Sequence, residues 1–310
     1  MNILISGGAG FLGSHVVDSL VKKSHRIFVL DNLLTGDTKN IHRHIESNRV
    51  EFLNYDVQNH IEISEDLDVV MHLASAASPK AYTQFPINTL KAGSIGTINT
   101  LGLAKNKKAK YLITSTSEIY GDPKESPQKE TYWGNVNPIG PRSMYDEAKR
   151  FSEACVTSYN NIHKLNTRIV RLFNTYGPRM KLNDGRVVTN FIYQALKNEN
   201  ITVYGDGTQT RSFCFATDTV KGIIKALDSN SGEVFNIGNP QEITVNELAE
   251  TIIKLTNSSS KIEFKELPID DPLKRKPDIT KARELLDWQP KVGLEEGLLE
   301  TINWVNSQIN

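Results

Sequence analysis

The sequence predicts an α/β fold: a Rossmann-type, doubly wound parallel sheet with a smaller C-terminal α/β substrate-binding domain. Short apolar runs alternate with stretches that repeat apolar residues at three- and four-residue spacing through about residue 172. Because the runs are apolar on both faces, each strand needs helices on both sides, as in a parallel sheet. From residue 174 turn residues cluster and the elements shorten. We therefore expect domains at residues 1–173 and 174–310, with some of the second crossing back to the sheet.

The periodicity assigns the elements of the first domain in order. Strands are expected at residues 2–6, 27–30, 51–54, 69–73, 111–114 and 167–172, and helices at residues 11–23, 86–105 and 145–163. Residues 268–277 contain an acidic pair and a basic triplet. This segment is too polar for a core, so we expect it to cross a surface or a cleft.

The composition favours an ordinary globular protein over a binder of nucleic acid or membranes. Of 310 residues, 38% are hydrophobic, and the net charge is +0, so no global field attracts polyanions. The two cysteines, Cys155 and Cys214, have no metal-ligand spacing, which favours a reducing compartment and predicts no metal site. The first residues are already strand-like, and no apolar run approaches roughly 18 residues. We expect a cytoplasmic protein without a signal peptide or membrane span.

A glycine-rich turn joins the first expected strand to the first helix. Gly7, Gly10 and Gly13 are spaced as GxxGxxG, which lets the backbone approach a pyrophosphate at a helix N-terminus. Asp31 closes the second strand, 18 residues after Gly13. Its carboxylate can accept hydrogen bonds from a ribose 2′-hydroxyl and repels a 2′-phosphate. This pattern predicts a site for NAD rather than NADP.

Two later strand ends can complete that cofactor site. Asp56 and Val57 follow the third strand, where an adenine edge would lie. Leu73 and Ala74 follow the fourth, beside the phosphates and ribose. Either pair could also be a simple strand end.

The expected chemical groups lie near the fifth strand and on the helix that follows it. Tyr145 and Lys149 are four residues apart, so they share one face of that helix. A nearby ammonium lowers a phenol pKa from about 10, which would make Tyr145 available as a general base. Thr116, in the stretch STSEIYG, is placed to hydrogen-bond the reacting hydroxyl.

Longer motifs resemble a known family over nearly the whole chain. They are GGAGFLGSH, DNLLTG, STSEIYGDP, YWGNVNPIGPRSMYDEAKR, FNTYGPRM, NDGRVVTNFI, VYGDGTQTRSF and DDPLKRKPD. Together they resemble the extended short-chain dehydrogenases/reductases that act on nucleotide sugars. YWGNVNPIGPR, NDGRVV and KRKPD are most similar to the branch that decarboxylates UDP-glucuronate. The resemblance implies a tightly bound, regenerated NAD and conversion of UDP-glucuronate to UDP-xylose and CO2.

The resemblance also implies roles for residues of the reacting centre. Tyr145 would take the C4 hydroxyl proton, Thr116 would align that hydroxyl, and Lys149 would also hold the nicotinamide ribose. Ser117 replaces an aspartate of the related 4,6-dehydratases. We expect Ser117 to contact the substrate carboxylate, and Glu118 to assist proton movement at C5 or to shape the sugar. Arg275 would clamp the carboxylate or act with a proton donor.

The remaining implied contacts are distributed along the chain. Further cofactor contacts are implied for Phe11, Leu12, Asn32, Thr35, Gly36, Thr175 and Arg179. Substrate contacts are implied for Lys91, Asn174, Arg186, Val187, Tyr204, Gln209, Arg211 and Arg275. Among these, Arg211 would bind the diphosphate and Tyr204 would pack on the uracil. Gly93 replaces a usual asparagine and is expected to loosen its helix and weaken one cofactor contact.

Three alternatives share much of this pattern. A UDP-sugar 4-epimerase would use the same threonine, tyrosine and lysine, and a nucleotide-sugar 4,6-dehydratase would use a related site. An NAD-binding sensor or scaffold could share the fold, although the complete Thr116, Tyr145 and Lys149 set argues against it. The resemblance implies a homodimer in which the helices at 86–105 and 145–163 form a four-helix bundle.

Overall fold

The computed structural model describes residues 1–182, 184–266 and 274–309. Its centre is a seven-stranded parallel sheet in the order β11-β6-β5-β4-β1-β2-β3. The strands are β1 (Asn2–Ser6), β2 (Arg26–Asp31), β3 (Val50–Asn54), β4 (Val69–His72), β5 (Lys110–Thr116), β6 (Thr167–Leu172) and β11 (Glu233–Ile237). The strand order reverses between β1 and β4, where doubly wound sheets bind ligands. The predicted fold class is confirmed.

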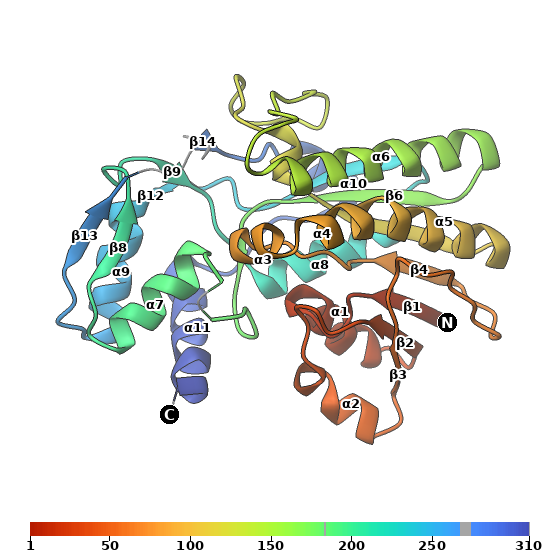
Figure 1. Ribbon diagram of the computed structural model, residues 1–310, viewed down its shortest axis with the longest axis horizontal. Coiled ribbons are helices and arrows are strands. Elements are labelled where there is room, and N and C mark those ends of the chain that lie inside the picture. The colour runs from red at the N-terminus through yellow and green to blue at the C-terminus, as the bar shows by residue number, and fades with distance from the viewer. Residues whose placement is uncertain (183, 267–273, 310) are drawn as a thin grey trace.

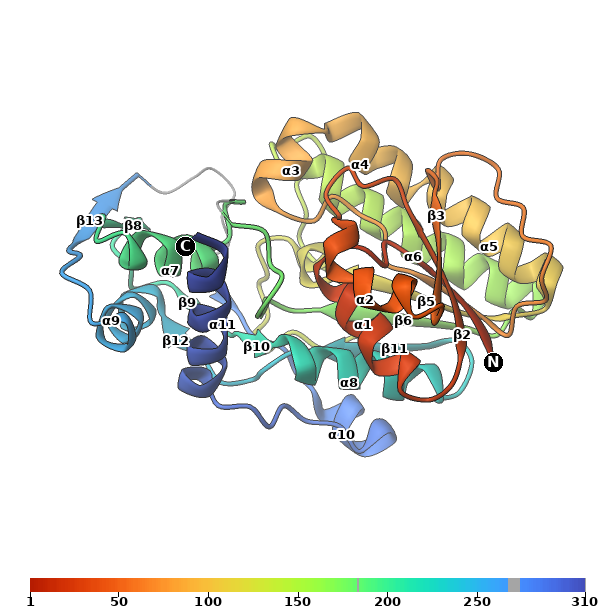
Figure 2. The ribbon, with the colours of Figure 1, turned by 90° about the horizontal axis from the view of Figure 1, so that it is seen from below.

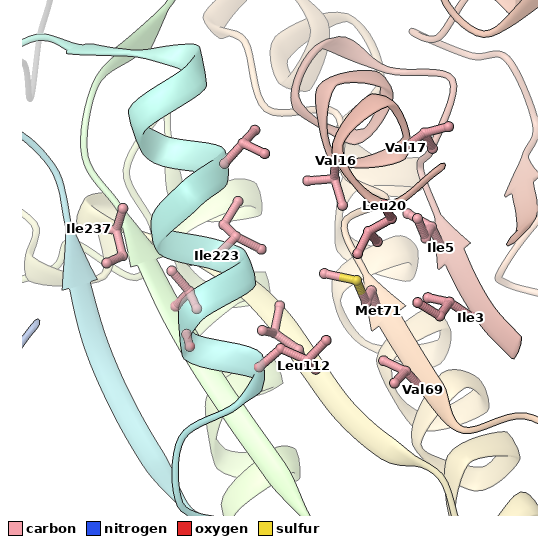
Figure 3. Close-up of a cluster of buried hydrophobic side chains, with 14 of the residues drawn as sticks. Ile3, Ile5, Val16, Val17, Leu20, Val69, Met71, Leu112, Ile223 and Ile237 are labelled. Atoms are coloured by element: carbon pink, nitrogen blue, oxygen red, sulfur yellow. The ribbon is translucent and has the colours of Figure 1, made fainter. Parts of the chain in front are cut away.

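Helices cover both faces of this sheet because alternate strand residues enter two different cores. Ile3 and Ile5 of β1 pack with α1 (Phe11–Val21) and α8 (Ala216–Leu227), and Figure 3 shows this cluster. Leu4 packs in the opposite core, which includes residues of α5 (Ile95–Lys107) and α6 (Ser143–His163). Burial on both faces explains the continuous apolar runs of the sequence.

The expected helix at 86–105 is divided into α4 (Pro86–Gly93) and α5 by Ser94. Ser94 has φ −102° and ψ −79°, and its hydroxyl donates to the carbonyl of Leu90 at 2.6 Å. Such side-chain bonds to the preceding turn bend helices. The short elements η1 (Thr38–Asn40), α2 (His42–Glu46) and α3 (Pro79–Gln84) are additional to those expected.

A second group of elements has its own core. This C-terminal lobe contains α7 (Val187–Leu196), β8 (Ile201–Tyr204), α9 (Val245–Thr256), β13 (Ile262–Lys265) and α11 (Leu294–Ile309). Strands β8 and β13 pair in parallel. Figures 1 and 2 show these elements grouped beyond one end of the sheet. In contrast, β11, α8 and α10 (Thr280–Leu286) come from the same half of the chain but pack with the sheet.

Small strands connect the lobe to the sheet. They are β7 (Thr175–Tyr176), β9 (Thr210–Arg211), β10 (Cys214–Phe215), β12 (Ile243–Thr244) and β14 (Lys274–Arg275). β9 pairs with both β12 and β14, and β7 pairs with β10. Just after β14, Lys276 and Asp278 exchange backbone hydrogen bonds with Gln128 at 2.8 Å each. Of the polar segment 268–277, residues 268–273 lie outside the described residues.

Candidate active site

A cleft of about 990 Å³ runs from the carboxyl ends of β1, β2, β4 and β5 to the C-terminal lobe. Parallel sheets bind their ligands at this edge because loops and helix N-termini meet there. Most of the residues singled out in the sequence line the cleft.

The glycine turn forms one end of the cleft, and at two of its positions the surrounding backbone leaves no room for a side chain. Gly7 has φ +75°, and a Cβ there would lie 2.6 Å from the nitrogen of Ala74. A Cβ at Gly13 would lie 2.0 Å from the carbonyl oxygen of Gly7. Gly10 is the N-cap of α1 and makes no side-chain hydrogen bond there, so the capping residue itself places no side chain over that helix N-terminus. This bare turn fits a dinucleotide pyrophosphate.

Asp31 provides the carboxylate beside that turn. Its Oδ2 accepts from the nitrogen of Ala9 at 3.1 Å, and its Oδ1 accepts from the nitrogen of Leu33 at 2.9 Å. Burial raises the pKa of the carboxyl, and the two backbone hydrogen bonds oppose that shift. Nearby, Asn32 donates to Asp56 at 2.8 Å. Asp31, Asn32 and Asp56 all line the cleft where an adenosine would fit.

Thr116, Tyr145 and Lys149 meet in the middle of the cleft. Thr116 ends β5, and the other two are buried in the first turns of α6. Tyr145 is hydrogen-bonded to Thr116, and Lys149 Nζ donates to the carbonyl of Thr114 at 2.8 Å. A phenol, a hydroxyl and an ammonium therefore converge on one part of the cleft.

The electrostatics of this group differ from the expectation that Lys149 lowers the Tyr145 pKa. Burial raises the pKa of Tyr145 above its ordinary value, and the hydrogen bond from Thr116 only partly offsets this. Burial lowers the pKa of Lys149 to about 8. Burial, followed by the positive charge of Lys149, lowers the pKa of His72 to about 3. Desolvation dominates because all three side chains are buried.

Glu118 is held between two arginines. Arg275 Nη1 donates to Glu118 Oε1 at 2.5 Å and to Ser117 Oγ at 3.1 Å, and Arg142 binds Glu118 Oε2. Burial opposes ionisation of Glu118, but the charges of Arg275 and Arg142 outweigh it and keep the pKa of this carboxyl below its ordinary value. Glu118 is therefore ionised near neutral pH and is a poor proton donor.

The C-terminal lobe lines the far end of the cleft. Arg186, Arg211, Tyr204 and Gln209 all line it, and Gln209 donates to the Tyr204 carbonyl at 2.6 Å. Cations and an exposed aromatic ring together suit a diphosphate joined to a base. Arg179, nearer to the glycine turn, pairs with Asp18 at 2.6 Å.

Two of the predicted site residues do not belong to the described cleft lining. Lys91 is exposed on α4, whereas Asn88 and Ala92 of the same helix line the cleft. Gly36 lies behind Asp31, because a Cβ there would be 3.0 Å from the Asp31 carboxylate. The other predicted residues all line the cleft, including Phe11, Leu12, Thr35, Val57, Leu73, Ala74, Asn174, Thr175 and Val187.

Two further residues, Tyr82 and Arg142, reach the centre of the cleft although no sequence pattern assigned them. Tyr82 stacks on Tyr145, with ring centroids 5.4 Å apart and planes at 14°. Arg142 binds Glu118 and lies 6.0 Å from the centroid of Tyr82. The arginine falls three residues before Tyr145 in the quoted motif NPIGPRSMY, which is the only signal that pointed to it.

Within residues 1–182, 184–266 and 274–309, no cluster of three or more His, Cys, Asp or Glu side chains could hold a metal ion. In the same ranges, no helix combines the length and the apolar character needed to cross a membrane.

Comparisons with known proteins point to one family. Residues 4–301 match the family model described as GDP-mannose 4,6 dehydratase. UDP-glucuronic acid decarboxylase 3 of Arabidopsis thaliana is 52% identical over 299 residues, which cover 96% of this chain and 87% of that protein.

Solved structures agree on the fold. UDP-glucose 4-epimerase of Thermotoga maritima, solved with UDP-glucose, matches with a TM-score of 0.92 and 31% identity over 100% of both chains. UDP-glucuronic acid 4-epimerase of Bacillus cereus, solved with UDP-glucuronic acid and NAD, matches with a TM-score of 0.90 and 28% identity. That match covers 99% of this chain and 100% of the other.

Proposed function

Because this chain belongs to the GDP-mannose 4,6 dehydratase family, we propose that its cleft binds NAD and a UDP-sugar and that it decarboxylates UDP-glucuronate to UDP-xylose and CO2. The relatives of about 50% identity that carry the name UDP-glucuronic acid decarboxylase support this activity. The observation that carries it in the structure is the buried Arg275, which reaches Ser117 and the ionised Glu118.

The reaction requires a temporary ketone. A carboxylate on C5 of the sugar does not leave readily, because its electron pair has no acceptor. Oxidation at C4 makes a β-keto acid, which loses CO2 to give an enolate. Protonation at C5 and reduction at C4 then give UDP-xylose. When bound, NAD supplies the hydride acceptor and later the hydride donor, so net consumption is nil.

The residues of β5 and α6 move and orient the proton at C4. Tyr145 takes the hydroxyl proton during oxidation and returns it during reduction, while Thr116 aligns the hydroxyl. Lys149 holds the nicotinamide ribose and places a positive charge near the phenol. Burial raises the Tyr145 pKa and the hydrogen bond with Thr116 lowers it, and we assign to the nearby Lys149 ammonium the positive charge that favours the base form.

Ser117, Glu118 and Arg275 favour decarboxylation over dehydration. Expulsion of the C6 hydroxyl needs a protonated acid, but two arginines keep Glu118 ionised. Arg275 is 2% exposed, and its Nε has no hydrogen-bond partner among the described residues. We assign Arg275 and Ser117 to the sugar carboxylate. Glu118, which stays ionised, is assigned to shaping the sugar and to assisting proton movement at C5 as a hydrogen-bond acceptor rather than as the proton donor.

The two ends of the cleft are assigned to different ligands. Residues 1–173 carry the glycine turn and Asp31 and would hold NAD, bound tightly and regenerated in each turnover. Residues 174–310 mainly hold the UDP group, with Arg211 on the diphosphate and Tyr204 on the uracil. Asn174, Arg186, Val187 and Gln209 complete this end.

We further infer a homodimer in a reducing, cytoplasmic setting. Leu90 on α4, Ile98 on α5 and Phe151 on α6 are 38%, 42% and 43% exposed, and these helices are neighbours. A four-helix bundle with a second copy would cover such apolar side chains. Cys155 and Cys214 form no disulfide in the structure, and a reducing compartment keeps such thiols reduced.

Product analysis tests the activity. Purified protein is incubated with NAD and UDP-glucuronate labelled at C6, and labelled CO2 with a UDP-pentose is expected. Tyr145→Phe should lower kcat by roughly 10³-fold, as loss of a general base does. An unlabelled gas phase with a 4-epimerised UDP-hexuronate would identify an epimerase instead, and NAD binding without turnover would identify a sensor.

A further inference from the structure

Gly93, the last residue of α4, lies where that helix meets the catalytic helix α6. A Cβ at Gly93 would lie 2.7 Å from the Cβ of Ala148 and 3.1 Å from the Ala148 carbonyl oxygen. Carbon atoms ordinarily stay about 3.5–4.0 Å apart. The helices are therefore closer than any side chain at position 93 allows. This differs from the expectation that Gly93 loosens its helix, because here the missing side chain permits tight packing.

The end of α4 is fixed, so it cannot move away from α6. Gly93 O accepts hydrogen bonds from Ser152 Oγ of α6 at 2.6 Å and from Thr97 Oγ1 of α5 at 2.8 Å. The carbonyl of Ala92 bonds His72 Nε2 of β4 at 3.3 Å. Ser152, Thr97 and His72 are all buried. The bonds from Thr97 and His72 hold the end of α4 against α5 and β4 independently of α6, so extra volume at position 93 would push on α6.

Displacement of α6 would move both of its reacting side chains. Tyr145 precedes Ala148 by three residues, and Lys149 follows it directly. Tyr145 is hydrogen-bonded to Thr116, and Lys149 donates to the Thr114 carbonyl at 2.8 Å. Both partners belong to β5, so the separation of α6 from β5 sets the geometry of the site.

We propose that Gly93 is a positioning residue: contact between its bare backbone and Ala148 sets the depth of α6 and so places Tyr145 and Lys149 against β5. The inference rests on the proposed decarboxylase activity. A displacement of about 1 Å can slow a reaction by roughly 10²-fold. The substrate grip lies mainly on the other lobe, so the effect should fall on kcat rather than on KM.

The test is a size exchange between the two contacting residues. Gly93→Ala should lower kcat by at least about tenfold and change KM for UDP-glucuronate by less than about threefold. The single-turnover rate at which reduced nicotinamide forms should fall by the same factor. Gly93→Ala with Ala148→Gly should recover kcat to within about threefold. Alanine has a higher helix propensity than glycine, so a loss would not reflect a weaker helix.

The matched control is Gly102→Ala on α5, where a Cβ meets nothing within 4 Å and kcat should stay unchanged. Wild-type kcat in Gly93→Ala overturns the proposal, as does a loss that Ala148→Gly does not recover. A lower melting temperature with unchanged kcat shows a merely structural role and also overturns it. If the wild type binds NAD without turnover, the proposed function fails. The positioning role is then tested by NAD affinity instead of kcat. Gly93→Ala should weaken NAD binding, and the double variant should restore it.

Discussion

Ser117 directly follows Thr116, which is hydrogen-bonded to Tyr145. Its hydroxyl accepts a hydrogen bond from the guanidinium of Arg275 at 3.1 Å. A carboxylate here would neutralise Arg275 and add a second acid beside Glu118. The sugar carboxylate would then meet a second negative charge beside the Glu118–Arg275 pair. We therefore expect the residue at position 117 to influence whether the site favours decarboxylation or dehydration.

Ser117→Asp should lower the rate of CO2 release by about 10²-fold or more, since it adds a second negative charge beside Glu118 where we place the sugar carboxylate. Ser117→Ala is the matched control: it removes the hydroxyl without adding charge and should cost about tenfold or less. Labelled gas from C6 measures both. Undiminished release by the aspartate variant would refute the assigned role of Ser117.

Asp146 follows Tyr145 on α6 and is 7% exposed, and its Oδ1 has no hydrogen-bond partner among the described residues. Burial, and then the charge of Glu118, raises the pKa of Asp146 to about 7. The folded state therefore binds this proton more tightly than the unfolded chain, so stability falls as pH rises from about 4 to about 7.

Asp146→Asn should remove that loss of stability because an amide stays neutral. At pH 8 its unfolding free energy should exceed that of the wild type by on the order of 4 kcal/mol, and near pH 4 the difference should largely vanish. Thermal unfolding at both pH values measures it. Asp66→Asn, on an exposed carboxylate, is the control. Equal effects at both pH values would contradict the buried-charge account.

The sequence predicted which residues line the cleft more reliably for residues in a local motif than for residues placed by tertiary packing. The glycine turn, Asp31 and the Tyr145–Lys149 pair each depend on short spacings and lie as expected. Tyr82 and Arg142 reach the site through packing between distant elements, which periodicity does not report. Lys91 illustrates the same limit, because which side of α4 faces the cleft depends on its contact with α6.

At the scale of elements, the capping box of α9 holds a helix next to the proposed diphosphate site. Thr244 accepts from the Glu247 nitrogen at 3.1 Å, and the Glu247 carboxylate accepts from the Thr244 nitrogen at 2.8 Å. Thr244 also belongs to β12, whose partner β9 carries Arg211. The cap therefore stabilises both α9 and the strand that presents the arginine.

Thr244→Ala should lower the unfolding free energy by about 1 kcal/mol, the usual cost of losing an N-cap. Thr251→Ala makes the same chemical change in the middle of α9 and should cost less, since alanine favours a helix interior. Urea unfolding followed by tryptophan fluorescence compares them. Equal losses in both variants would show that the cap has no special role.

Elements were predictable where burial on both faces leaves a continuous apolar run. All six expected strands exist, with ends shifted by a few residues at most. The break at Ser94 depends on a side-chain hydrogen bond and on packing with α6, so the apolar spacing across residues 86–105 could not reveal it. The two-residue strands β7, β9 and β14 are too short to carry any periodicity.

At the scale of the whole molecule, the exposed apolar residues of α4, α5 and α6 predict self-association. Phe151→Asp should convert the proposed dimer into a species with the 34.7 kDa mass of one chain, because a buried carboxylate disfavours an apolar interface. Light scattering after gel filtration measures the mass. Phe264→Asp, at a 56% exposed phenylalanine on β13, is the control and should remain dimeric. A monomeric wild type would contradict the proposed bundle.

Arg275 belongs to β14, which pairs with β9 of the small-strand group, yet its side chain reaches Glu118 beside the sheet. Immediately afterwards the chain is tied to Gln128 by backbone bonds. The reacting centre is thus assembled from segments more than 150 positions apart. A chimera that joins the N-terminal half of one relative to the C-terminal half of another would take Glu118 and Arg275 from different proteins. Exchanges that preserve chemistry must transplant residues 117–118, 128 and 274–278 as one discontinuous block.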